Sequence, residues 1–142
     1  EKRARKFDNI LADIAPPALN GPADADVTLI GWGSTDGIIA EAVDALNAAG
    51  VSTNHLQIKW IVPFHGDQIM EFLSKAKRTI IVENNYSGQF ARYLRSETGF
   101  AADGHIRKYD GEPFMPHHIV DGVQAQVGGE TDKYVPYQEI TV

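Results

Sequence analysis

The sequence predicts an α/β fold, with a mostly parallel β-sheet that carries helices on both of its faces. Three observations predict it. Short apolar runs alternate with segments whose apolar residues recur at helical spacing, which is typical of βαβ units. Turn-forming residues separate these segments, at Gly50, Pro63 and Gly99. No internal repeat or low-complexity tract interrupts the alternation.

The alternation begins with two strand–helix pairs. Val27–Ile30 is an apolar run ended by a glycine, as a buried parallel strand would be. Ile38–Leu46 follows with apolar residues at helical spacing and stops before a glycine. Leu56–Ile61 alternates apolar and polar residues and ends before a proline, which predicts a second strand. Ile69–Leu73 then resumes the helical spacing.

Two further pairs complete the pattern. Thr79–Val82 is another apolar run and predicts a buried strand. Phe90–Leu94 marks a helix for which Ser87 is the expected N-cap. Ile106–Tyr109 is the fourth expected strand. The last helix, Pro116–Val127, begins with proline, which suits the first helical position.

The regular pattern occupies residues 27–128, which we expect to form one αβα domain. Residues 1–26 carry four basic residues near their start and the sequence Ala15-Pro16-Pro17, and we interpret them as a basic linker or helix end from a preceding domain. Residues 129–142 are expected to form an irregular tail. The chain therefore reads as a piece of a longer protein, although a processed small protein with a basic arm is the alternative.

Composition excludes several classes of function. Hydrophobic residues make up 43% and charged residues 23% of the 142 residues, as in a globular domain. The net charge of −6 argues against a general nucleic-acid binder, which needs a basic face. The absence of cysteine excludes disulfides, thiolate metal sites and cysteine nucleophiles from this chain. No apolar run approaches the ~20 residues of a membrane span. We expect a cytoplasmic domain with no nucleic-acid or membrane partner.

Two loops stand at the expected carboxyl ends of strands, where α/β sheets collect ligands. The first loop resembles a dinucleotide-binding turn, but its spacing is G-x-G-x-x-x-G rather than G-x-G-x-x-G. The second combines an acid, amides and a phenol into a dense hydrogen-bonding patch. The candidate interface or ligand residues are Gly31, Trp32, Gly33, Ser34 and Thr35 in the first loop and Glu83, Asn84, Asn85, Tyr86 and Gln89 in the second.

The other candidate residues indicate neither a catalytic site nor a metal site. The adjacent His117 and His118 point about 100° apart on a helix and cannot hold one metal together. Arg92 and Arg95 lie away from the apolar stripe of their helix and indicate a solvated or interface face. The residues by themselves therefore predict no catalytic residue and no metal site.

The same loops carry a family resemblance. Gly31-Trp32-Gly33-Ser34-Thr35, the motif E-N-N-Y-x-G-Q from Glu83, and Lys108-Tyr109-Asp110-Gly111-x-Pro113-Phe114 resemble the C-terminal region of the alpha chain of 2-oxoacid:ferredoxin oxidoreductases, closest to the 2-oxoglutarate type. The likeness covers about residues 27–127. One departure is Met115, where a hydroxyl residue capping the last helix is expected.

The resemblance implies a three-layer αβα sandwich, similar to the transketolase C-terminal domain. The whole enzymes use thiamine pyrophosphate, magnesium, an iron–sulfur cluster and coenzyme A to convert a 2-oxoacid, CoA and oxidised ferredoxin into acyl-CoA, carbon dioxide and reduced ferredoxin. By the resemblance, this chain is an accessory domain that binds none of these cofactors. Its implied partners are the preceding thiamine-binding domain of the same chain, the beta subunit and, for the whole enzyme, ferredoxin.

The alternatives are the equivalent domain of a transketolase or of a 2-oxoacid dehydrogenase beta chain, or a free-standing α/β module that binds a small anion at the two loops. If the resemblance holds, the isolated chain is inactive and the two loops dock against the thiamine-binding domains, with Glu83, Asn84 and Asn85 supplying hydrogen bonds. A competing interpretation is that these side chains only brace their own loop.

Overall fold

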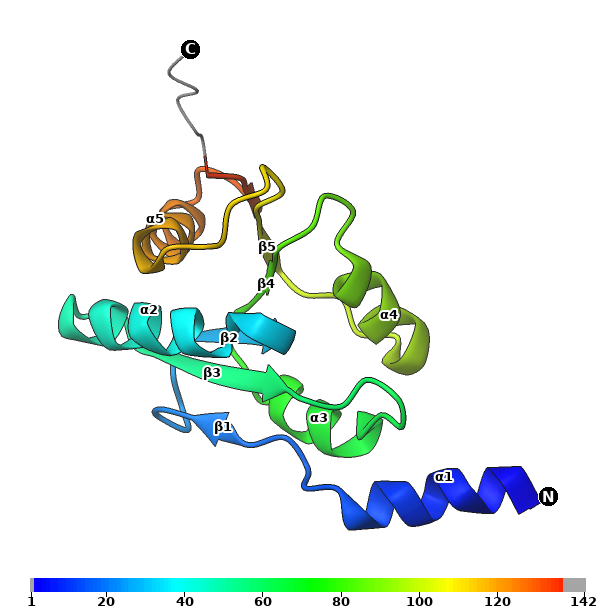
Figure 1. Ribbon diagram of the computed structural model, residues 1–142. Coiled ribbons are helices and arrows are strands. Elements are labelled where there is room, and N and C mark those ends of the chain that lie inside the picture. Colours follow the sequence, from blue (N-terminus) through cyan, green and yellow to red (C-terminus); the bar gives the residue numbers. More distant parts are fainter. Residues whose placement is uncertain (1, 137–142) are drawn as a thin grey trace.

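Six strands form one sheet in the computed structural model, which describes residues 2–136 (Figure 1). The strands are β1 (Leu19–Asn20), β2 (Val27–Trp32), β3 (Thr53–Ile58), β4 (Thr79–Glu83), β5 (Gly104–Arg107) and β6 (Lys133–Tyr134). The helices are α1 (Lys2–Asp13), α2 (Asp36–Ala48), α3 (Gly66–Leu73), α4 (Gln89–Thr98) and α5 (Pro116–Val127), with a 3-10 turn at Gly33–Thr35.

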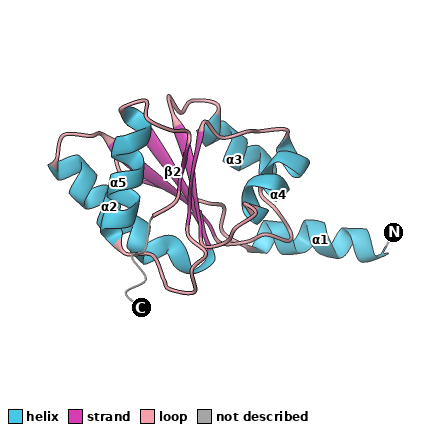
Figure 2. Cartoon of the chain, turned by 90° about the horizontal axis from the view of Figure 1, so that it is seen from above, coloured by secondary structure: helices cyan, strands magenta, loops and turns pink. Residues whose placement is uncertain are grey.

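The sheet has the order β1-β3-β2-β4-β5-β6, and every pairing except that of β1 with β3 is parallel. Helices α2 and α5 cover one face, and α3 and α4 cover the other, which gives three layers (Figure 2). The predicted α/β class with a mostly parallel sheet is confirmed.

Each face of the sheet has its own core. On one side Ile39, Ala42 and Leu46 of α2 are fully buried against β2, β4 and α5. On the other side Ile69 of α3 and Leu94 of α4 are buried against β2, β3 and β4. Because strands β2, β3 and β4 are covered on both faces, all of their residues except Trp32 are buried.

The second strand differs from the prediction. It spans Thr53–Ile58 rather than Leu56–Ile61, because its register with β2 begins at Thr53 and because the Asn47 side chain bonds both backbone groups of Thr53, each at 2.9 Å. It does not alternate between buried and exposed residues. Its polar side chains, including His55 and Gln57, are buried and hydrogen-bonded, since both faces are covered.

The fourth predicted strand and the chain ends also differ. β5 spans Gly104–Arg107 instead of Ile106–Tyr109, because Lys108 turns inward, is 1% exposed and bonds Asp110 and the carbonyl of Glu112. Outside the predicted domain limits, β1 pairs with β3, and β6 pairs with β5. The tail is therefore not wholly irregular. The remaining tail, residues 137–142, lies outside the described residues, as does Glu1.

Candidate functional site

The two predicted loops lie side by side at one edge of the sheet. β2 and β4 are parallel neighbours, with Ile30 opposite Ile81, so the loops that follow them leave the same edge. Trp32 at the end of β2 stacks on Phe90 in the first turn of α4, with ring centroids 5.8 Å apart and planes at 27°. The stacked rings join the first loop to the helix that follows the second.

The first loop is held tightly by its own residues. The Thr35 hydroxyl is buried, donates to the carbonyl of Trp32 at 2.9 Å and accepts from its N–H at 3.2 Å. Gly31 has no room for a Cβ, which would meet Ile39 of α2, Gln57 of β3 and the Thr35 hydroxyl. Glycine at position 31 therefore allows the turn to pack closely against α2 and β3.

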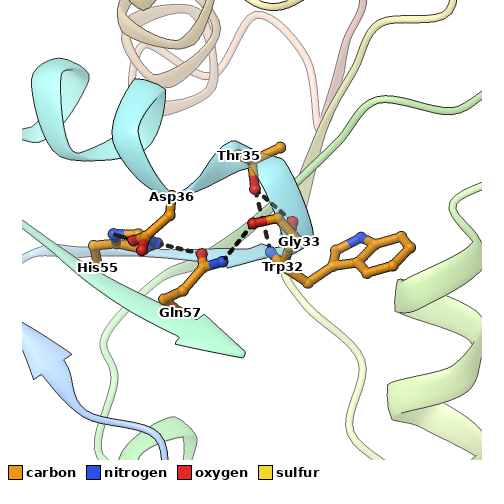
Figure 3. A network of polar contacts seen from close by, with 6 residues as sticks. All are labelled: Trp32, Gly33, Thr35, Asp36, His55 and Gln57. Atoms are coloured by element: carbon orange, nitrogen blue, oxygen red, sulfur yellow. Dashed lines mark hydrogen bonds and ion pairs between the residues drawn. The ribbon is translucent and has the colours of Figure 1, made fainter. Parts of the chain in front are cut away.

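A buried polar network supports this turn from β3 (Figure 3). The Gln57 amide nitrogen donates to the carbonyl of Gly33 at 3.1 Å, so its amide oxygen faces His55 and accepts from the imidazole Nε2 at 3.0 Å. The other ring nitrogen, Nδ1, lies 3.8 Å from Asp36. Burial lowers the pKa of His55, against the hydrogen bond to Gln57 and the charge of Asp36, which raise it.

Glu83 organises the second loop. Its side chain is fully buried, and its carboxylate accepts from the backbone N–H of Phe90 at 2.8 Å, the N–H of Ala91 at 3.0 Å and the Asn85 amide at 2.9 Å. These bonds satisfy the free N–H groups at the start of α4. The predicted N-cap, Ser87, is wrong: Gly88 occupies that position, and the carboxylate from the end of β4 does the capping.

Asn85 also braces the loop. Its side-chain oxygen accepts from the N–H of Gly88 at 2.8 Å and of Gln89 at 3.1 Å. These hydrogen bonds of Glu83 and Asn85 thus run within the chain, as the interpretation that the two side chains brace their own loop predicts. Asn84 is exposed and takes part in none of the side-chain hydrogen bonds found among residues 2–136.

What remains exposed at this edge is a small polar and aromatic surface. It comprises Ser34, Asn84, Tyr86 and Gln89, and we call it the carboxyl-edge surface. Tyr86 is 68% exposed and meets the ring of Tyr109 edge-to-face, with centroids 5.0 Å apart. A rigid loop that presents exposed side chains suits binding without a large ordering cost.

The start of the last helix explains the Met115 departure. The side chain of Met115 makes no cap hydrogen bond, and its backbone N–H donates instead to Nδ1 of His118 at 3.1 Å. Pro116 occupies the first helical position, as expected. The His118 ring thus accepts from the N-cap backbone, as the third helical residue does in a capping box, and the N–H of His118 donates to the carbonyl of Met115 at 3.0 Å.

Sequence reasoning missed a cavity of about 270 Å³ at the carboxyl end of β3. The segment Ala15–Ala18 forms one wall, and Asp36, Lys59, Trp60 and His65 contribute to the others. His65 is 5% exposed, and its Nε2 has no hydrogen-bond partner in the described part of the chain. The cavity depends on the packing of a segment that precedes the regular pattern, so sequence spacing gave no signal of it.

Metal-ligating side chains do not cluster among the described residues. Among residues 2–136, no group of three His, Asp or Glu side chains could hold a metal ion. The chain has no cysteine to ligate an iron–sulfur cluster. Within the same range, no helix is both long and apolar enough to span a membrane.

Comparison with known proteins decides the family. Residues 25–119 match the family described as pyruvate:ferredoxin oxidoreductase core domain II. The chain belongs to this family. The subunit alpha of 2-oxoacid:ferredoxin oxidoreductase 1 from Aeropyrum pernix is 38% identical over 117 residues, which cover 81% of this chain and 18% of that protein. Other relatives are named for 2-oxoglutarate or for ketoisovalerate.

Solved structures agree with this core domain II assignment. The 2-oxoglutarate:ferredoxin oxidoreductase from Magnetococcus marinus, solved with 2-oxoglutarate, coenzyme A and succinyl-CoA bound, matches with a TM-score of 0.80 and 30% identity, over 89% of this chain and 22% of that chain. A split-gene transketolase matches with a TM-score of 0.61 at 15% identity, over 80% of this chain and 41% of that chain, which shows a shared fold. The chain spans about a fifth of the length of the curated alpha subunits that it matches.

Proposed function

We propose that this chain is an assembly domain of a thiamine-pyrophosphate-dependent 2-oxoacid:ferredoxin oxidoreductase, in the cytoplasm, and that its carboxyl-edge surface docks against the thiamine-binding domains. The observation that carries the proposal is the exposure of Tyr86 on a loop that Glu83 and Asn85 hold rigid. Exposed tyrosines on preorganised backbone are typical anchors of protein interfaces.

The residues of the second loop fall into a buried, hydrogen-bonded group and an exposed group, and this difference supports the proposal. The bonds of Glu83 and Asn85 run to the backbone of the same loop and of α4, so these two residues shape the surface. Asn84, Tyr86 and Gln89 are exposed and supply the contacts. Docking therefore rests on Asn84, Tyr86 and Gln89, and Glu83 and Asn85 act as positioning residues.

The proposed reaction of the whole enzyme is the conversion of a 2-oxoacid, CoA and oxidised ferredoxin to acyl-CoA, carbon dioxide and reduced ferredoxin, with 2-oxoglutarate as the substrate. The structural similarity to an enzyme named for 2-oxoglutarate supports the choice of this substrate. The beta subunit and ferredoxin are the proposed partners. In this proposal the chain contributes a docking surface, and other domains bind the cofactors.

Variants of the assembled oxidoreductase test the docking role. Asn84→Ala and Gln89→Ala are expected to weaken subunit association about tenfold or to raise the KM for the 2-oxoacid, while the Tm of the 142-residue chain stays nearly unchanged. Gln124→Ala, which truncates an exposed amide on α5, is the matched control. A marked fall in Tm with unchanged association and kinetics would show that the two amides are structural.

An activity assay tests the accessory role and the substrate. With thiamine pyrophosphate, magnesium, CoA and a viologen acceptor supplied, the 142-residue chain is expected to give no turnover of 2-oxoglutarate above a no-protein control. The assembled oxidoreductase is expected to prefer 2-oxoglutarate to pyruvate and to ketoisovalerate. Turnover by the chain alone would contradict the accessory role, and preference for another acid would contradict the substrate.

A further inference from the structure

A small hollow of about 190 Å³ lies between α4 and β5. Arg92 and Arg95 line it from α4, and His105 and Arg107 line it from β5. Alanines form the rest of its wall. We call it the α4–β5 hollow.

The strand places its polar residues on this side by alternation. Ile106 of β5 is buried in the core beneath α2 and α5, so His105 and Arg107 face the opposite side of the sheet, toward α4. The described core beneath α3 and α4 contains no residue of β5. The sheet here exposes polar side chains where the neighbouring strands bury apolar ones.

Two nitrogen atoms of the hollow have no hydrogen-bond partner among the described residues. Arg107 Nε and His105 Nδ1 are buried nitrogens without a hydrogen-bond partner in the described chain. No ion pair among residues 2–136 involves any of the three arginines. Buried polar atoms in folded proteins usually have a partner, and these two nitrogens remain available to bond a ligand or water.

Arg107 is also held in place. Its guanidinium lies so close over Gly88 that a Cβ there would collide with it, and its Nη1 donates to the carbonyl of Tyr86 at 3.4 Å. Glu83 and Asp132 carry negative charges that act on His105, but neither carboxylate forms an ion pair with Arg107 within residues 2–136.

We propose that the α4–β5 hollow binds the phosphate group of a small ligand. Planar guanidinium groups bond phosphate oxygens in pairs, and three arginines line this hollow in a chain whose net charge is −6. Lys133, opposite His105 in the register of β5 and β6, adds a positive charge near His105. The volume lies below the ~300 Å³ of a pocket for a drug-sized molecule, so it suits one charged group of a ligand.

Phosphate titration of the 142-residue chain, followed by NMR at constant ionic strength, tests the proposal. Inorganic phosphate is expected to shift the side-chain resonances of Arg92, Arg95 and Arg107 with a saturating curve, and acetate is expected to bind at least tenfold more weakly. Arg95→Gln is expected to weaken phosphate binding at least tenfold. The matched control, Arg5→Gln, removes an exposed arginine on α1 that does not line the hollow.

Arg107→Gln is the sharper variant but removes a packed side chain, so Arg92→Gln, on the exposed face of α4, repeats the test without that risk. Loss of binding in Arg92→Gln and Arg95→Gln, with Arg5→Gln unchanged, supports the site. Equal binding of phosphate and acetate would assign the hollow to carboxylates and overturn the proposal. So would shifts no larger than those with chloride, or an equal loss in Arg5→Gln.

Discussion

At the scale of single residues, Glu83 decides the shape of the site. A carboxylate with no exposed surface is costly to bury unless its oxygens are bonded, and here three N–H groups from the loop and from α4 supply the bonds. The same contacts fix where α4 begins. The carboxylate of Glu83 is therefore a structural cap of α4.

Removal of this cap has a predictable effect. Glu83→Ala leaves the N–H groups of Phe90 and Ala91 and the amide of Asn85 without their acceptor, so we expect the free energy of unfolding to fall by about 3 kcal/mol. Asn84→Ala, one residue away and exposed, is expected to change it by no more than about 0.5 kcal/mol. Denaturant titration of both variants measures the difference, and equal stabilities would show that the bonds of Glu83 do not hold the loop.

His55 gives a pH-dependent prediction. Burial is the main cause that lowers its pKa from 6.5, and burial likewise lowers the pKa of His105 and His118. The unfolded chain therefore binds more protons than the folded chain as the pH falls below 6.5, so stability is lost from there down toward the lowered pKa values. We expect a lower free energy of unfolding at pH 5 than at pH 7.5.

NMR titration of the imidazole of His55 measures the same effect at its source. We expect its midpoint below 6.5, with the neutral ring protonated on Nε2. A midpoint at or above 6.5 would mean that the ion pair with Asp36 outweighs burial, and the predicted direction would then be wrong.

At the scale of elements, the end of β2 fits against α2 and β3 only because residue 31 is glycine. Gly31→Ala would push a Cβ into Ile39 and Gln57, so we expect a loss of about 2 kcal/mol of stability. Gly37→Ala, in α2 with open space around it, is the matched control and is expected to stay within about 0.5 kcal/mol of the parent. Equal effects at the two positions would show that the close packing of β2 is not what holds the turn.

The same elements show what sequence reasoning can predict. Apolar runs such as Thr79–Val82 and the stripe on α2 predict the core strands and helices, because burial on both faces leaves few polar residues in them. β3 is the exception: its register is set by side-chain bonds from Asn47 and its buried His55 and Gln57 are satisfied across elements. Contacts between residues far apart in sequence leave no periodic signal.

The candidate site, too, could be predicted from the sequence only in part. That the two loops share an edge follows from parallel strands, and the structure places them together. Which side chains stay free does not follow, because Glu83 reaches seven residues ahead to Phe90 and Asn85 folds back on its own loop. Arg107 was not singled out because Arg92 and Arg95, which line the same hollow, belong to another element, and sequence spacing gives no signal of that arrangement.

At the scale of the whole molecule, the two faces of the sheet are covered and the carboxyl edge is not. The core lies in two layers beneath the helices. Tyr86 and Tyr109, both exposed, contact each other at the carboxyl edge. The docking role that we propose uses this uncovered edge.

The most direct measurement of this account is the solvent accessibility of Tyr86, by hydroxyl-radical footprinting of the free 142-residue chain and of the assembled oxidoreductase. In the free chain, we expect Tyr86 to be oxidised readily, as its 68% exposure requires. In the assembled oxidoreductase, we expect Tyr86 to be strongly protected, together with Tyr109 beside it. Equal oxidation of Tyr86 in the two samples would contradict the proposal that the carboxyl-edge surface docks against the thiamine-binding domains.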